Sequence, residues 1–126
     1  MNIERIKKLA EVLRSPVAQD HFDMSDYFFW DLNVEMDEKV SEAIHKCGTT
    51  ACIAGWAVTI FAPDTKVNCG SEIHSMAQEL LDLTTAQAVT LFLPESMKAI
   101  NNINPVTAAK VLDDLAETGE VMWTDR

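Results

Sequence analysis

The side chains best suited to chemistry are three cysteines and two histidines in the middle of the chain. His45, Cys47 and Cys52 read H-x-C-x4-C, and Cys69 and His74 follow as C-x4-H. Sulfur and imidazole ligands of this kind bind zinc tetrahedrally. The spacing differs from the common zinc knuckle, in which two cysteines stand about two to four residues apart on a tight turn. We therefore favour packed free thiols, with a zinc site as the alternative.

A reactive thiol pair is the second chemistry that these residues suggest. If Thr49 caps the following helix, Cys52 occupies its third position, where the positive end of the helix dipole favours a thiolate. Cys47 lies just before that cap and is the candidate resolving partner. The spacing is not C-x-x-C, and the chain lacks the βαβ pattern of thioredoxin-like proteins. Burial of Cys52 inside an apolar helix also opposes the thiolate, so packing is again favoured.

Sequence motifs typical of enzymes are absent. The chain has no G-x-S-x-G elbow, no phosphate-binding glycine loop and no H-E-x-x-H. Asp113 and Asp114 are adjacent, so on a helix they point about 100° apart and do not form a paired-carboxylate site. A nucleophile at Cys47 has His45 nearby but no third group to orient it. We expect no enzymatic activity.

Negative charge is the feature of the composition with the greatest functional reach. The 126 residues include 20 Asp and Glu against 10 Lys and Arg, for a net charge of -10. Between Asp20 and Glu42 there are eight acidic residues and one basic residue, Lys39. A nucleic-acid-binding protein needs a basic face, so the net charge of this chain argues against direct nucleic-acid binding. The candidate recognition helix, Pro105 to Thr118, is itself acidic. We expect a protein partner with a basic surface.

Aromatic residues are interleaved with the acidic ones in this segment. Five aromatic side chains cannot all lie in water, so most of them are expected to anchor the segment on the core. Carboxylates steer a basic partner, and aromatic residues are frequent hot spots of binding. The expected contact residues are Asp20, Asp23, Asp26, Tyr27, Trp30, Asp31 and Glu35. A helical ligand pocket lined by Trp30 and Trp56 is an open alternative.

Apolar residues at helical spacing predict an all-α domain spanning residues 1–126. The first helix starts after a cap at Asn2, has a stripe from Ile3 to Leu13, and ends before Pro16. The segment before Trp30 reads as a short helix capped by Ser25 or Asp26, or as an extended stretch from Phe22 to Met24. Later helices are expected from Ser71 to Leu81, from Thr84 or Thr85 to Leu93, and from Pro105 to Gly119. A short turn is expected from Glu95 to Ile100, and Glu120–Trp123 is expected to pack back onto the bundle.

The segment Thr50–Ala62 is predicted to be the central helix. Ten of its 13 residues are apolar and no face is polar, so it belongs in the middle of a core. Gly55 costs about 1 kcal/mol relative to alanine in a helix, which indicates close approach of another backbone. Trp56 is the natural centre of packing. We expect a compact bundle of about five or six helices around this segment.

The string CGTTACIAGWA, from Cys47 to Ala57, resembles the signature Cys-Gly-Thr-x-Ala-Cys-x-x-Gly-Trp-Ala of a family of small bacterial and phage-borne proteins. Phe22-x-Met24 followed by Trp30, the helical turn Leu81 to Phe92 and the terminal Pro105 to Trp123 are also similar to that family. The resemblance implies a fold and a lineage but no chemistry. Mobile-element proteins of this size are often inhibitors or adaptors, which by analogy predicts a non-catalytic acidic protein-binding module.

The sequence also predicts a cytoplasmic protein without membrane contact. No apolar run reaches the roughly 18–20 residues that cross a bilayer. The stretch MNIERIKKLAEVLRS lacks the continuous apolar core of a signal peptide. Three cysteines, an odd number, do not suggest a secreted disulfide framework.

Overall fold

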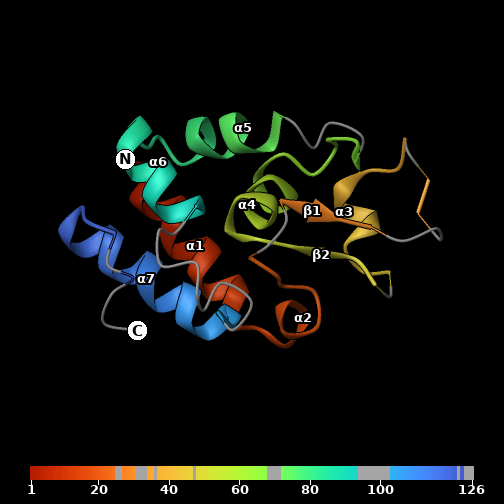
Figure 1. The fold of residues 1–126 in the computed structure, drawn as a ribbon, viewed down its shortest axis with the longest axis horizontal. Helices are drawn as coiled ribbons and strands as arrows, with labels where there is room; N and C mark the ends of the chain where they lie inside the picture. The colour runs from red at the N-terminus through yellow and green to blue at the C-terminus, as the bar shows by residue number, and fades with distance from the viewer. Residues whose placement is uncertain are drawn as a thin grey trace.

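The computed structural model describes residues 1–24, 27–30, 34–35, 37–46, 48–67, 72–93, 103–121 and 123, and these are mostly helical (Figure 1). The helices are α1 (Ile3–Arg14), α2 (Pro16–Gln19), α3 (Val40–Ala43), α4 (Ile53–Phe61), α5 (Ile73–Leu80), α6 (Thr85–Phe92) and α7 (Pro105–Thr118). Within the described residues the number of helices exceeds the expected five or six, because α2 and α3 each add a single turn. None of these helices is long and apolar enough to cross a bilayer.

A short antiparallel sheet, β1 (Phe28–Phe29) and β2 (Thr50–Ala51), is the main departure from the all-α prediction. Phe28 pairs with Ala51 and Phe29 with Thr50. On its other side Ala51 forms a parallel bridge with Phe22. The predicted helix ending at Trp30 is therefore wrong at β1, while the extended alternative is confirmed at Phe22. Strands of two residues are too short to show an alternating pattern in the sequence.

The central helix α4 is shorter than the predicted Thr50–Ala62. Its first residue is Ile53, because Thr50 and Ala51 are extended and paired with β1. Cys52 is the N-cap, with no capping hydrogen bond from its side chain, so the assignment of Thr49 as the cap was wrong. The prediction of burial is confirmed, since every residue from Ile53 to Thr59 is buried. Figure 1 shows α4 between the sheet, α5 and the α1–α7 side of the molecule.

Gly55 allows another segment of backbone to approach α4 closely, as predicted. A Cβ atom built on Gly55 would lie 1.9 Å from the carbonyl oxygen of Tyr27 and 2.7 Å from the Cβ atom of Ala51. No side chain larger than hydrogen fits there. Tyr27 directly precedes β1, so the missing side chain of Gly55 sets how closely the sheet lies on α4.

Local signals in the sequence correctly predict the ends of the outer helices. Asn2 caps α1 by accepting a hydrogen bond from the backbone N–H of Arg5, and Thr84 caps α6 in a capping box with Gln87. Asn104 caps α7, which continues to a left-handed C-cap at Gly119. The start predicted at Ser71 and the turn predicted at Glu95–Ile100 lie outside the described residues.

The outer helices bury the predicted stripes with two exceptions. α1 packs against α7, and α5 packs against α4. Ile3, the first residue of the predicted stripe, is exposed, and so is Val106, which falls at helical spacing with the buried Ala109 and Leu112; each lies in the first turn of its helix. After α7 the chain returns to α6 as predicted, because the indole N–H of Trp123 donates to the carbonyl oxygen of Thr90 at 2.9 Å.

Candidate functional site

β1 and α3, which belong to the predicted contact segment, lie at the same end of the molecule (Figure 1). Phe28 is buried against the core, and Tyr27 and Trp30 are half-buried on it. Phe22 is also half-buried and packs against the core, so the prediction that aromatic residues anchor this segment is confirmed for these four. Phe29 points the other way, and 51% of it is exposed. Nothing in the sequence marks Phe29 as exposed, because β1 is too short to show which of its positions faces outward.

Of the carboxylates predicted to contact a partner, Asp20 and Glu35 are exposed. Asp23 is half-buried. Asp26 and Asp31 lie outside the described residues. Two further carboxylates of the segment, Asp37 and Glu42, are exposed and were not among the predicted contacts.

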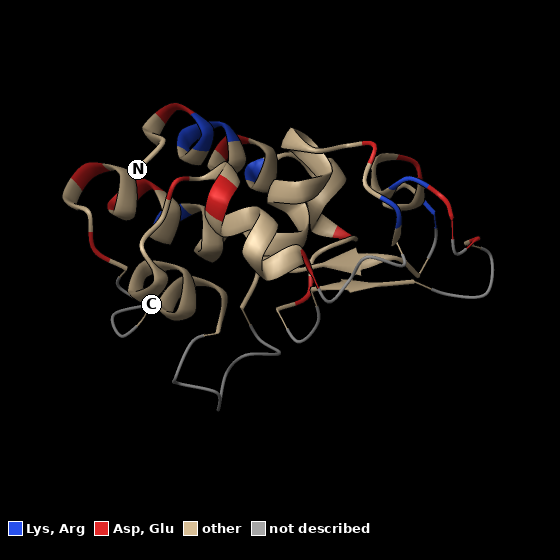
Figure 2. Ribbon diagram, turned by 90° about the horizontal axis from the view of Figure 1, so that it is seen from above, with Lys and Arg blue, Asp and Glu red and all other residues tan. Residues whose placement is uncertain are grey.

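A basic side chain from outside the segment offsets part of this negative charge, because Lys46 forms an ion pair with Glu38 at 2.7 Å. Lys39, the basic residue of the segment itself, pairs instead with Asp64 outside it, at 3.3 Å. Figure 2 shows red and blue segments together at this end of the molecule. Within the described residues, no ion pair joins a basic side chain to the three exposed carboxylates nearest α3, which are Glu35, Asp37 and Glu42.

Glu38, which precedes α3, is bonded to Lys46 in the turn that follows α3. The hydrogen bond from the Lys46 ammonium lowers the pKa of Glu38. The backbone carbonyl of Glu38 accepts from Val67, and the bridge between Lys39 and Lys66 continues this contact. These bonds fix the chain at Glu38 and Lys39, directly before α3.

The residues predicted as the alternative metal site lie in different environments. His45 is exposed after α3, Cys52 is 1% exposed at the start of α4, and His74 is half-buried on α5. Cys47 and Cys69 lie outside the described residues. Among the residues with described positions, no three His, Cys, Asp or Glu side chains are grouped closely enough to hold a metal ion. The zinc alternative therefore depends on Cys47 and Cys69.

The structure does bring Cys52 and His74 together with Tyr27. The Tyr27 hydroxyl and Nδ1 of His74 are 2.8 Å apart and hydrogen-bonded. The His74 ring lies edge-on to Tyr27 at 5.8 Å and to Phe92 at 5.2 Å. Burial, and after it electrostatic repulsion from the nearby Cys52, raise the pKa of the Tyr27 hydroxyl. The carbonyl of Tyr27 thus lies against α4 at Gly55, and its hydroxyl fastens the start of β1 to α5.

Tyr27→Phe is expected to lower stability by about 1 kcal/mol at neutral pH, because it removes one hydrogen bond. It should also change the alkaline limb of the pH profile. Because the pKa of Tyr27 is raised on folding, the unfolded chain loses this proton first, near pH 10, and stability falls as the pH rises further. Urea unfolding from about pH 8 to about pH 11 should therefore show a shallower alkaline decline in the variant than in the wild type. Tyr27 is the only tyrosine, so a parallel decline in both proteins would contradict the shift.

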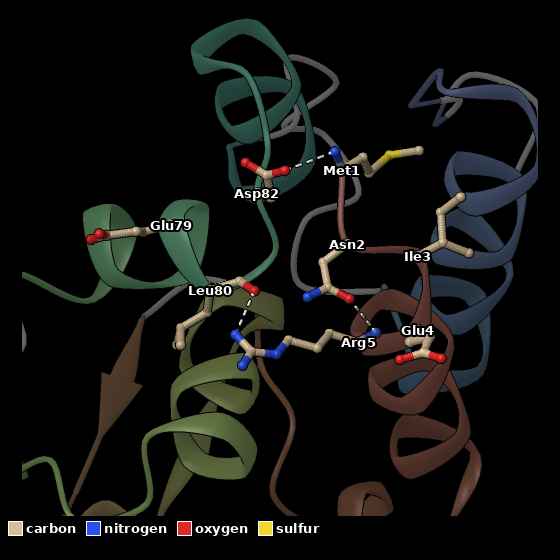
Figure 3. A pocket seen from close by; sticks show the side chains of 8 residues that line it. All are labelled: Met1, Asn2, Ile3, Glu4, Arg5, Glu79, Leu80 and Asp82. Carbon is tan, nitrogen blue, oxygen red and sulfur yellow. Dashed lines mark hydrogen bonds and ion pairs between the residues drawn. The ribbon is translucent and has the colours of Figure 1, made fainter.

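The groove in Figure 3 contains none of the predicted site residues. It has a volume of about 560 Å³ and is lined by Met1, Asn2, Ile3, Glu4, Arg5, Glu79, Leu80 and Asp82. Arg5 donates to the carbonyl oxygen of Leu80 at 2.9 Å and lies over the Phe61 ring at 5.4 Å. The Met1 ammonium pairs with Asp82 at 3.1 Å. The contacts of Arg5 and of the Met1 ammonium join α1 to the end of α5. The groove is therefore a junction between helices.

Comparisons with known proteins give no match for this chain. No family model matches it, and neither a curated protein nor a solved structure is significantly similar to it. The function is therefore argued from the chain's own residues and their geometry.

Proposed function

We propose that this chain is a non-catalytic acidic protein-binding module whose partner has a basic surface. The contact surface is the β1–α3 end, defined as Phe29, Trp30, Glu35, Asp37 and Glu42. The observation that carries the proposal is the exposed ring of Phe29 on the same end as three exposed carboxylates that lack an ion pair with any described basic side chain.

The combination of an aromatic ring and surrounding carboxylates suits protein recognition. An aromatic side chain supplies contact area with few rotatable bonds, and aromatic residues are enriched among the residues that dominate binding energy. Carboxylates at the rim speed association with a basic partner and discriminate against acidic ones. Phe29 therefore acts mainly on the lifetime of the complex, and the carboxylates act mainly on the rate at which it forms.

The β1–α3 end is also held in place before any partner binds. β1 is paired with β2, and Tyr27 is fixed against Gly55 and His74. Such order reduces the entropy lost on binding. It supports recognition of a specific partner over general attraction to positive charge.

A role as an inhibitor or adaptor agrees with the net charge of -10 and with the resemblance of Cys47–Ala57 to phage-borne proteins. Proteins that bind nucleic acids carry basic faces, and an acidic protein can occupy such a face in place of the phosphates. We propose a nucleic-acid-binding protein as the class of partner.

Charge reversal at the β1–α3 end tests this proposal. The partner is captured by a photo-reactive amino acid in place of Phe29, and its binding kinetics are then measured at low and physiological salt. The triple variant Glu35→Lys, Asp37→Lys, Glu42→Lys should lower the association rate about tenfold at low salt with little change in dissociation. Phe29→Ala should instead raise the dissociation rate about tenfold.

A matched control carries the same change of charge elsewhere. Glu72→Lys, Glu79→Lys and Glu117→Lys replace three exposed carboxylates, which lie just before α5, on α5 and on α7 respectively. This control should slow association much less. Equal loss in both triple variants would reduce the effect to net charge, and an acidic captured partner would overturn the proposal.

A further inference from the structure

Helix α6 is apolar on two opposite faces, although only one of them is buried. Its sequence TAQAVTLF contains no charged residue. Ala88, Leu91 and Phe92 face the core. On the opposite side Val89 is 44% exposed, and Leu93, the C-cap residue, is 46% exposed.

The exposed residues form a continuous stripe. Ala86, Val89, Thr90 and Leu93 follow one another at intervals of i, i+3, i+4 and i+7, which places them on one side of the helix. The outer face of a surface helix is normally polar or charged, whereas Val89 and Leu93 are large apolar residues on this one. α1 shows the usual contrast, because Lys7, Lys8 and Glu11 occupy its exposed face.

A groove runs beside this stripe, between α6 and the chain after α7. Its volume is about 300 Å³, and it is lined by Ala86, Gln87, Thr90, Gly119, Glu120 and Val121. Two hydrogen bonds fix the far wall, one from Nε2 of Gln87 to the Gly119 carbonyl at 3.0 Å and one from Trp123 to Thr90. We call this groove, together with the stripe of Ala86, Val89, Thr90 and Leu93 beside it, the α6 groove.

Among the described residues, the charged side chains at the α6 groove are acidic. Glu120 is the charged residue in the described lining, and Glu117 precedes it on the last turn of α7. The chain contains no Lys or Arg from Val67 to Leu93. In a two-fold dimer this surface would meet the same carboxylates on a second copy, which is unfavourable. The occupant must therefore bring the positive charge.

We propose that the α6 groove is a second docking site, which binds an amphipathic helix of a partner protein. The apolar face of that helix covers Val89 and Leu93, and its Lys or Arg side chains lie opposite Glu120. Grooves of this kind commonly recognise helices through apolar anchors three and four residues apart. The site is separate from the β1–α3 end, so either proposal stands or fails without the other.

Two model peptides test the α6 groove directly. Each is a labelled amphipathic helix of about 15 residues with leucine on one face, and the other face carries lysine in one peptide and glutamate in the other. Fluorescence anisotropy should show binding of the lysine peptide only. Val89→Ser with Leu93→Ser leaves the charge unchanged and should weaken that binding about tenfold. Glu120→Gln should weaken it about threefold at low salt and not at high salt.

The matched control is Ile3→Ser with Val106→Ser, which removes equally exposed apolar residues on α1 and α7. This control should bind the lysine peptide as the wild type does. Equal affinity of the wild type and the Val89/Leu93 variant would reduce the binding to general attraction by a protein of charge -10, and would overturn the proposal. A dimer in sedimentation that the Val89/Leu93 variant abolishes would overturn it too, because the occupant would then be a second copy.

Discussion

Gly55→Ala is expected to lower the free energy of unfolding by about 3 kcal/mol or more. The new methyl group would lie 1.9 Å from the Tyr27 carbonyl oxygen, and this neighbour is backbone that cannot rotate away. Either the start of β1 moves off α4 or α4 shifts within a close-packed core. The intrinsic preference of a helix for alanine, about 1 kcal/mol, acts in the opposite direction and is outweighed. Urea unfolding followed by far-ultraviolet circular dichroism measures the change.

Gly119→Ala is the matched control for this prediction. Gly119 has φ of 80°, so alanine there is strained, but nothing lies within 4 Å of the added Cβ atom. The strain alone costs about 1 kcal/mol. If Gly55→Ala proves neutral or stabilising, the Tyr27 carbonyl does not lie against α4, and β1 is not held in place by this contact before binding.

The parts of the fold that the sequence predicts are those set by local signals. Asn2, the Thr84 capping box, Asn104 before Pro105 and Gly119 each satisfy backbone groups within a few residues of themselves. Their side chains therefore mark the helix ends whatever the rest of the chain does. The burial of α4 follows as directly, because a helix without a polar face has no side to present to water.

The sheet could not be predicted because its partners are far apart in sequence. Thr50 and Ala51 suit a helix by pattern, yet they pair with β1 and, through Ala51, with Phe22. This tertiary pairing outweighs local preference and moves the start of α4 to Ile53, with Cys52 as the cap. The same pairing turns Phe29 outward, so the sequence did not identify the most exposed aromatic residue of the segment.

The candidate site shows the same division. The excess of carboxylates between Asp20 and Glu42 is a property of composition and is evident in the sequence. Which of them are neutralised depends on Lys46 and on the pair that Lys39 forms with Asp64, outside the segment. The outer face of α6 was not predicted either, because only the structure shows that Val89 and Leu93 face outward while Ala88, Leu91 and Phe92 face the core.

Trp56→Ala is expected to have the largest effect of any single substitution, lowering the free energy of unfolding by about 4 kcal/mol. Trp56 is 2% exposed at the centre of α4, so its removal leaves a large cavity. Its indole N–H donates to the His21 carbonyl at 3.0 Å, and that carbonyl also accepts from Ala51 of β2. The loss therefore reaches the sheet as well as the core. A loss this large is a substantial share of the stability of a small domain.

Trp123→Ala and Trp56→Phe divide this effect into its parts. Trp123 makes a hydrogen bond of the same kind, to Thr90, but is only half-buried, so its removal should cost about 1 kcal/mol. Trp56→Phe keeps most of the volume and removes the hydrogen bond, so its cost should fall between the other two. Urea midpoints at equal m-values rank the three variants. If Trp123→Ala were as costly as Trp56→Ala, the core would be centred on α6 and α7, and the sheet with its exposed Phe29 would not depend on α4.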